Sequence, residues 1–368
     1  MTRSAADIRA VLQERLPPAD PTAHVDVLGA GVDLGAGLER CRGYLEAMAP
    51  GGWGTPDWPV EHGGAGLDDD ELDRFYEELA AFDVPDLYPV LIGLGMAGPM
   101  IIRAGTAVQQ ARWLEPTRTG AEVWCQLFSE PEAGSDLAGL RTRATAVDGG
   151  WCLSGQKTWV SRAAFADWGL VLARSGSLEA RHRAITAFVL PMDRPGVELV
   201  PIRQANRDSH FSEVYLNDVE LSDEYRLGEV DGGWAIAMAT LAAERSVAAR
   251  SGSAGVPPEA VFGLVRESGA ADDPLVRQAA ARVLTELKLL RLASDAPGQK
   301  IRLARAMRQF ADLSESVRGA HSMLDDDWAT VRLTTPSLSI RGGTDEIQRN
   351  VIGERVLGLP RDPAPPRS

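Results

Sequence analysis

The sequence predicts an α+β protein with a helical N-terminal domain, a middle antiparallel β-domain and a C-terminal bundle of helices. Three observations support this fold class. A helical period dominates residues 1–120, short β-type runs separated by turns fill residues 121–225, and the helical period returns over residues 226–358. Because the strands are grouped rather than alternating with helices, the pattern excludes a βαβ dinucleotide fold as the main body.

The helical N-terminal domain is clearest at residues 71–82. Acidic residues lie on one side of this segment, and apolar residues such as Leu72, Phe75 and Leu79 lie on the other. This spacing predicts an amphipathic helix. Residues 51–67 before it are dense in Gly, Pro and Trp, so a loop is expected there.

The middle β-domain is predicted from runs of β-forming residues that are bounded by turn signals. The expected strands are 123–128, 141–147, 151–160, 168–172, 184–190 and 213–216. Asp148 and Gly149 lie between two of these runs and favour a hairpin turn.

The C-terminal zone has the length and the periodicity of four helices. Breaks are expected near residues 252–258 and 296–298, and a four-helix bundle fits the length. The segment 359–368 is rich in Pro and Arg, and a disordered tail is expected there.

Composition and charge limit the function of the chain. It has 368 residues and a net charge of −14, from 52 acidic and 38 basic residues. Such a surface repels nucleic acid and anionic membranes, so neither is an expected partner.

The cysteines indicate a reducing compartment. Three are present, Cys41, Cys125 and Cys152, and they form no Cys-x-x-Cys pair. The N-terminus is polar and the longest apolar stretch, 87–102, is too short for a membrane span, so we expect a cytoplasmic protein.

Three incomplete motifs point to other chemistries. Gly29 and Gly31 follow a strand-like run, but Leu34 stands where a dinucleotide-binding fingerprint needs its third glycine. Residues 62–66 are similar to the oxyanion loop of α/β-hydrolases, but residues 251–255 lack the first glycine of a nucleophile elbow. The five histidines have no metal-ligand spacing, so no metal site is expected.

The segment 233–249 is the strongest candidate for chemistry. Apart from Glu244 and Arg245 it is uncharged and apolar around its full circumference, and such a helix is normally buried on all sides. Adjacent helical residues point about 100° apart, so these two charges do not face each other. A carboxylate with apolar neighbours is expected to have a raised pKa, which suits Glu244 as a general base. An ion pair between Glu244 and an Arg elsewhere in the bundle fits the pattern equally well.

Four blocks of sequence then resemble one known family. They are WPVEHGG at residues 58–64, WCQLFSEPEAGSD at 124–136, GQKTWVS at 155–161, and GGTDEIQRN at 342–350 followed by GERVLG at 353–358. In content and order these blocks resemble the acyl-CoA dehydrogenase family. The resemblance spans nearly the whole chain and implies that the middle domain is a β-barrel and that the C-terminal domain is a four-helix bundle.

The resemblance also implies a cofactor, FAD, and a set of contacts for it. Trp159 is expected to pack on the isoalloxazine ring and Ser161 to form a hydrogen bond near its reactive nitrogen. The residues implied to bind FAD are Gln126, Phe128, Ser129, Ser135, Trp159, Ser161, Arg277, Thr344 and Glu346. The residues implied to bind the substrate are Ser135, Arg245, Arg341 and Gly342.

Part of FAD is held by a neighbouring subunit in this family, so a homodimer or homotetramer is expected. Arg277 matches the Arg that contacts phosphate, and an Arg fork suits that ligand. The chain departs from the family pattern at Ala280, where an aromatic residue is frequent. The Gly-rich adenosine loop is matched only loosely by residues 318–323.

The catalytic Glu of many family members stands just before the Gly-Thr of the closing motif, which is Gly342 here. In isovaleryl- and long-chain-type members the Glu comes instead from the buried helix, in a Glu-Arg pair that Glu244 and Arg245 match. The resemblance therefore implies that Glu244 removes the α-proton of an acyl thioester while hydride leaves Cβ. The Gly342 N–H would stabilise the thioester carbonyl.

Several alternatives stay open at this level. The chain could be a base-less or partner subunit of a heteromeric acyl-CoA dehydrogenase, a flavin oxidase, or a dehydrogenase whose substrate is bound to an acyl carrier protein. An electron-transfer flavoprotein is the expected electron acceptor. Arg341 could pair with Glu244, bind a carboxylate on the substrate or point away.

Overall fold

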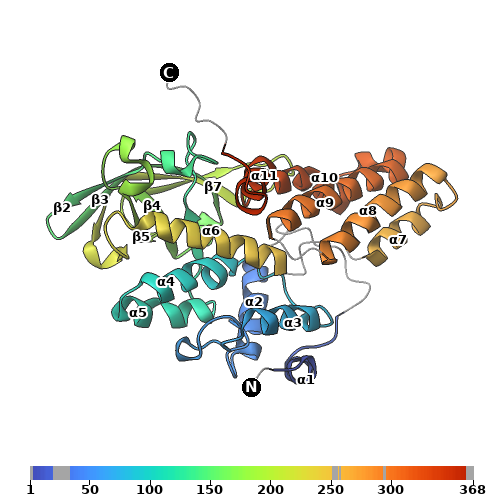
Figure 1. The fold of residues 1–368 in the computed structure, drawn as a ribbon, viewed down its shortest axis with the longest axis horizontal. Coiled ribbons are helices and arrows are strands. Elements are labelled where there is room, and N and C mark those ends of the chain that lie inside the picture. The colour runs from blue at the N-terminus through green and yellow to red at the C-terminus, as the bar shows by residue number, and fades with distance from the viewer. Residues whose placement is uncertain (1–2, 20–33, 251–255, 257, 293–295, 362–368) are drawn as a thin grey trace. The chain divides into compact units, whose positions relative to one another are not determined.

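The computed structural model describes residues 3–19, 34–250, 256, 258–292 and 296–361 (Figure 1). The chain divides into two compact units, and it passes from the first to the second between Glu244 and Arg245, within the helix α6 (Gly233–Arg250). The expected domain boundaries at residues 120 and 225 stay a prediction, and most of the expected C-terminal tail lies outside the described residues.

The first unit begins with helices, three of which are capped at their starts by side chains. These helices are α1 (Ala5–Arg15), α2 (Leu34–Met48), α3 (Asp69–Leu79), α4 (Gly98–Ala104) and α5 (Ala107–Arg118). The predicted helix 71–82 corresponds to α3, which starts earlier because Asp68 and Glu71 form a capping box around its first turn.

The apolar stretch 87–102 is largely helical, although two prolines interrupt it in sequence. A π-helical turn, Gly93–Ala97, leads directly into α4. Trp58 from the preceding loop lies against this segment, and its Nε1 donates a hydrogen bond of 2.9 Å to the Leu94 carbonyl. A Cβ atom on Gly98 would lie 2.0 Å from the Trp58 ring, so only glycine permits this approach.

The middle of the chain forms one mixed sheet. Its strands are β1 (Trp124–Leu127), β2 (Arg143–Val147), β3 (Gly150–Ser161), β4 (Trp168–Arg174), β5 (Ile185–Pro191), β6 (Val197–Ile202), β7 (Phe211–Ser222) and β8 (Arg226–Leu227). Strand order is β6-β7-β3-β2-β4-β5-β8, with β1 paired to β4. The expectation of a purely antiparallel domain is wrong in one respect, because β1 pairs with β4 in parallel and β2 meets β4 in parallel at one residue pair.

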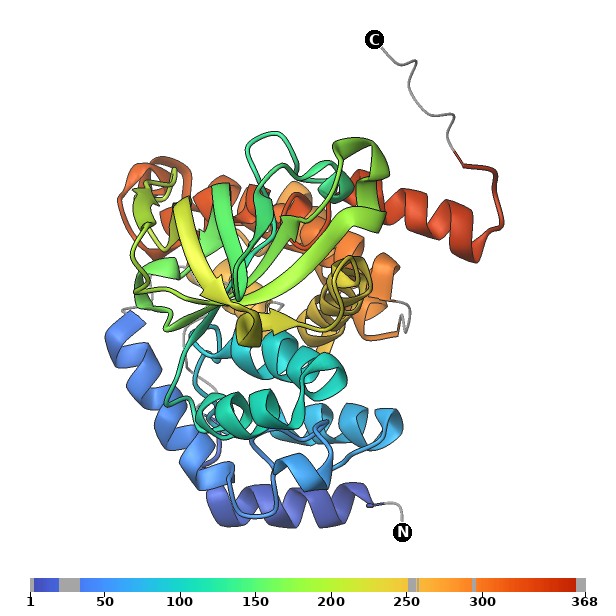
Figure 2. The same cartoon turned by 90° about the vertical axis from the view of Figure 1, so that its left-hand side faces the viewer.

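The sheet has an apolar core on each face. One core lies inside the curl of the sheet, as expected for a barrel, and includes Leu153, Val171, Phe188 and Leu216. The pairings among the described strands run from β6 to β8 without joining these two ends. The outer core is covered by α4, α5 and α6, and α6 lies between the strands and α4 (Figure 2).

The second unit is helical, as predicted. Its helices are the end of α6, α7 (Pro258–Glu267), α8 (Pro274–Leu292), α9 (Ala296–Arg318), α10 (Asp327–Thr334) and α11 (Asp345–Val351). Helices α7, α8 and α9 run side by side (Figure 1) around a core that includes Val283 and Phe310. The break expected near residues 296–298 is confirmed with a small shift, because α8 ends at Leu292 and α9 begins at Ala296. None of the helices in the described ranges is long and apolar enough to cross a membrane.

Candidate functional site

The end of β3 is distorted where the second motif lies. Trp159 and Arg162 both have left-handed backbone conformations, with φ of 57° and 58°, and the pairing with β7 shifts register between Lys157 and Val160. A bulge of this kind turns a side chain away from the alternation of the strand. Trp159 is 58% exposed, with Phe211 beside it at a centroid distance of 5.8 Å. This places an open aromatic surface at the end of β3.

The first motif lies directly beside this surface. The backbone N–H of Thr158 donates to the Ser129 carbonyl over 3.0 Å, which joins the end of β3 to the segment after β1. Gln126 on β1, Ser129 and Ser161 are half-buried here. The structure therefore brings together predicted site residues that are some 30 positions apart in sequence.

Phe128 and Ser135 occupy two different environments. The Phe128 ring is buried in the outer core, so only its backbone groups can face a ligand. Ser135 is exposed on the loop that follows β1. Next to it, Asp136 forms an ion pair with Arg181.

A fully buried ion pair joins the two motifs. The ammonium of Lys157 lies 2.8 Å from Glu130 Oε1 and donates to the Phe128 carbonyl at 3.2 Å. Burial alone raises the pKa of Glu130, but Lys157 and the backbone donors around it hold that pKa below its ordinary value. Burial lowers the pKa of Lys157, and Glu130 opposes the shift. The pair sits within the motifs but was not predicted as part of the site.

Arg162, which follows Ser161, is also buried. Its guanidinium carbon lies 3.2 Å from the ring centroid of Tyr88, which comes from the N-terminal helical region. The pKa of Arg162 lies below its ordinary value, because burial outweighs the opposing effects of Tyr88 and Asp86. This stack anchors the end of β3 to the segment before the π-helical turn.

Glu244 lies on α6 in line with the buried face of that helix. Ala237 and Thr240 are fully buried, and Glu244 follows them at spacings of seven and four residues, which puts all three on one helix face. Glu244 itself is half-buried. The expectation that the helix is buried on all sides is wrong for the single chain, because Ala235 and Ala242 are exposed. The side chain of Arg245 lies outside the described residues.

In the second unit the closing motif forms a tight glycine turn before α11. Gly342 and Gly343 have left-handed φ values of 66° and 86°, and a Cβ on Gly343 would lie 2.6 Å from Gln348. Thr344 caps α11 by accepting a hydrogen bond from the Ile347 N–H. The turn therefore needs glycine for its backbone shape, whatever it binds.

The remaining predicted residues of the second unit differ in exposure. Arg341 is half-buried, and its backbone N–H donates to the Ser337 carbonyl. Glu346 is exposed on α11 and pairs with Arg349 at 3.6 Å. Arg277 is exposed on the first turn of α8, where it is accessible to an anionic ligand.

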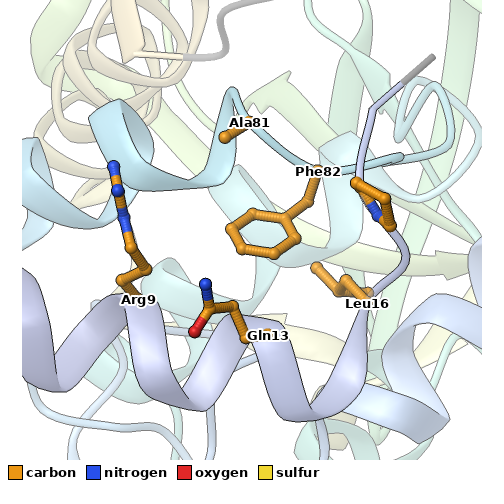
Figure 3. Close-up of a pocket in the computed structure, with 6 residues that line it drawn as sticks. Arg9, Gln13, Leu16, Ala81 and Phe82 are labelled. Carbon is orange, nitrogen blue, oxygen red and sulfur yellow. The ribbon is translucent and has the colours of Figure 1, made fainter.

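A separate shallow pocket lies between α1 and the turn after α3 (Figure 3). Phe82 projects between the two segments, and the opposite wall is formed by Arg9 and Gln13 of α1 and by Leu16, which follows α1. Arg9 pairs with Glu78. The pocket contains none of the predicted site residues, so it is not the candidate site. Over the described ranges, no group of three or more His, Cys, Asp or Glu side chains has the geometry to hold a metal ion.

Comparisons with known proteins decide the family. The models of the acyl-CoA dehydrogenase N-terminal, middle and C-terminal domains match residues 30–121, 125–219 and 231–357. The chain belongs to the acyl-CoA dehydrogenase family. FAD is the cofactor of this family, so the protein is a flavin-dependent oxidoreductase.

Two of the relatives are acyl-CoA dehydrogenases of Mycobacterium tuberculosis. The chain is 37% identical to acyl-CoA dehydrogenase IpdE1 of Mycobacterium tuberculosis over 88% of its own length and 89% of the relative's. It is 38% identical to FadE34 of the same organism, where the match covers 86% of this chain but 46% of FadE34.

Solved structures show the same fold. A steroid acyl-CoA dehydrogenase titled Tcur3481-Tcur3483 aligns with a TM-score of 0.79 and 24% identity, and covers 97% of each chain. The ChsE4-ChsE5 complex from Mycobacterium tuberculosis aligns with a TM-score of 0.75 and 25% identity, over 98% of this chain and 99% of that one.

The residues at the end of β3 fit the ring of this cofactor. A flavin needs a flat apolar wall with polar groups at its edge, and Trp159 supplies an exposed ring beside the half-buried Ser161 and Ser129. The strained backbone at Trp159 also fits, because such outliers concentrate at binding sites.

The residues that the sequence did not single out are Glu130, Lys157 and Arg162. Each stands inside or next to a quoted motif, and each is charged at a position that becomes buried. Lys157 could have been recognised from the sequence, because it is a lone charge in a strand of otherwise uncharged residues. A charge that is buried in such a strand needs a partner.

Replacing Trp159 tests the flavin-binding surface. In Trp159→Ala the dissociation constant of FAD is expected to rise about tenfold to a hundredfold, from the loss of a stacking surface. Since the side chain is exposed, the melting temperature of the apoprotein should change little. Titration of apoprotein with FAD measures the constant, and Val200→Ala, at an exposed position on β6, is the control. Unchanged FAD affinity in Trp159→Ala would remove Trp159 from the binding surface.

Proposed function

We propose that this chain oxidises the Cα–Cβ bond of an acyl-CoA thioester to a 2-enoyl thioester, with Glu244 as the general base. The observation that carries the proposal is the place of Glu244 on α6, on the same helix face as the buried residues Ala237 and Thr240. Abstraction of a weakly acidic proton needs a positioned carboxylate, and Glu244 is a half-buried carboxylate on this face.

The closing motif supports the same assignment. Gly342 carries no side chain, so the base must come from another element if the chain acts alone. We assign to the Gly342 backbone the role of donating a hydrogen bond to the thioester carbonyl, which stabilises the enolate character that develops as the α-proton leaves.

The flavin-facing residues would hold the cofactor in this reaction. Trp159, Ser161 and Ser129 would bind the ring, while Arg277 and Thr344 would contact its phosphates and adenosine through a neighbouring subunit. When bound, FAD accepts the hydride from Cβ. Glu244 holds the α-proton after transfer, and an electron-transfer flavoprotein is the proposed electron acceptor in the cytoplasm.

A second candidate is a subunit of a heteromeric acyl-CoA dehydrogenase. The ChsE4-ChsE5 complex contains a chain that is 25% identical to this one. In that case two different chains would share the FAD and substrate contacts, and Gly342 would mark this chain as the partner without a base in its closing motif. Glu244 favours the self-sufficient enzyme over this second candidate.

An anaerobic visible spectrum distinguishes these functions. The purified protein, supplied with FAD, is mixed with a panel of acyl-CoA thioesters that differ in chain length, branching and ring content. Bleaching of the flavin band by one of them is the expected result, and it names the acyl group. If no thioester bleaches the band, the proposal that this chain alone oxidises an acyl-CoA fails, and a substrate bound to an acyl carrier protein or a missing partner subunit becomes the leading explanation. A native mass that contains a second, different chain after co-purification from the source would then support the heteromer.

A further inference from the structure

The loop between β1 and β2, residues 128–142, is closed at both ends by one buried carboxylate. Glu130 Oε2 accepts a hydrogen bond of 2.6 Å from the Arg141 N–H, and Oε1 accepts one of 2.9 Å from the Thr142 N–H. Glu130 also forms a tight turn with Ala133 through two backbone hydrogen bonds of 3.1 Å. We call residues 128–142 the flavin-edge loop.

Lys157 connects this closed loop to the strand that carries Trp159. Its ammonium is bonded to Glu130 and to the Phe128 carbonyl, and the side chain is fully buried. Two positions further along β3, Trp159 turns outward. A shift of the loop relative to β3 would therefore have to break a buried charged hydrogen bond.

A second buried cation holds the other end of the loop. The Arg174 guanidinium donates to the carbonyls of Leu140 and Ala138, each over 2.8 Å, and the Arg174 N–H donates to the Thr142 carbonyl. The loop end also packs closely on β3, because a Cβ on Gly155 would lie 2.6 Å from Thr142 Oγ1. The loop is thus held at residues 128–130 and again at 138–142.

Buried ion pairs are poor sources of stability, since desolvation cancels much of their attraction. What this pair does supply is directional hydrogen bonding to three backbone groups of one loop, at Phe128, Arg141 and Thr142. Such buried networks fix one arrangement of the segments they join.

We propose that Glu130 and Lys157 are positioning residues for the flavin, which lock the flavin-edge loop and the end of β3 into a single preorganised surface. The inference rests on the flavin contacts proposed above for Ser129, Ser135, Trp159 and Ser161. Neither side chain touches the cofactor, because both are buried inside the protein. Their effect is on where the contacting residues stand.

The test removes the charges and asks whether the fold and the flavin surface respond differently. The double variant Glu130→Gln/Lys157→Met leaves no lone buried charge, so its melting temperature as apoprotein should stay within a few degrees of the parent. Its FAD dissociation constant should nevertheless rise about tenfold to a hundredfold, and amide hydrogens of residues 130–142 should exchange at least about tenfold faster in the holoprotein. The variant Glu130→Gln/Lys157→Gln, which also leaves no lone buried charge and keeps a polar group at both positions, covers the case in which the first double variant does not fold.

Glu132→Gln is the matched control on the same loop. Glu132 pairs with Arg141 at 2.9 Å, but both side chains are at least 65% exposed. Unchanged FAD affinity and exchange are expected in this control. The proposal is overturned if the double variant, or Glu130→Gln/Lys157→Gln in its place, binds FAD and exchanges like Glu132→Gln. Neither readout uses a thioester, so the test stands even if Glu244 is not the base.

Discussion

Glu244→Gln is expected to slow bleaching of the flavin by the substrate thioester about a hundredfold to ten-thousandfold, which is the range a positioned general base contributes. The amide has the same shape but cannot accept the α-proton. FAD should bind as in the parent protein, because Glu244 lies on α6 and not on the surface around Trp159. Anaerobic stopped-flow absorbance measures the rate.

Glu229→Gln is a suitable control for this variant. Glu229 is exposed just before α6, so the change removes the same charge from the surface. Its bleaching rate should equal that of the parent. If Glu244→Gln also bleaches at the parental rate, the base lies elsewhere, and a base supplied by a partner subunit becomes the leading explanation.

Trp58→Ala is expected to lower the stability of the first unit by about 3–5 kcal/mol, as for other large-to-Ala core substitutions. Trp58 is 1% exposed, and its ring fills the space that Gly98 leaves open. Loss of the Trp58 ring opens a cavity beside the π-helical turn and removes the hydrogen-bond donor to the Leu94 carbonyl. Scanning calorimetry of the apoprotein should show the lowest-temperature transition moved down by several degrees.

The exposed Trp159 provides the comparison for Trp58→Ala. The same chemical change at Trp159 leaves no buried cavity, so Trp159→Ala should melt within about 1 °C of the parent. Equal shifts in the two variants would show that Trp58 does not support the helical part of the first unit. A Trp58→Phe variant should recover part of the loss, since it restores most of the buried ring.

Local sequence patterns predicted the helices and strands that have a regular spacing of apolar residues. The helix at residues 71–82 and the strand at 151–160 were predicted because apolar residues recur at the period of each structure, and both exist with shifted ends. Strand β6 (Val197–Ile202) was missed. It contains Pro201 and alternates between half-buried and exposed positions at the edge of the sheet, so its sequence carries little strand signal.

Other outcomes depended on contacts between distant segments. The parallel pairing of β1 with β4 joins residues more than 40 positions apart, and no local pattern specifies its direction. The left-handed backbone at Trp159 likewise follows from the bulge in the β3–β7 ladder rather than from the preference of tryptophan.

The sequence by itself determined the fold class, the family and the cofactor, because these depend on periodicity and on motifs that stay intact along the chain. Only the tertiary structure decided how the two flavin motifs meet, with Thr158 bonded to Ser129 and Lys157 bonded to Glu130. The reason is physical. A motif names the residue types that a site needs, whereas the burial that makes a charge structural and the approach of two backbone segments arise only when distant parts of the chain pack together.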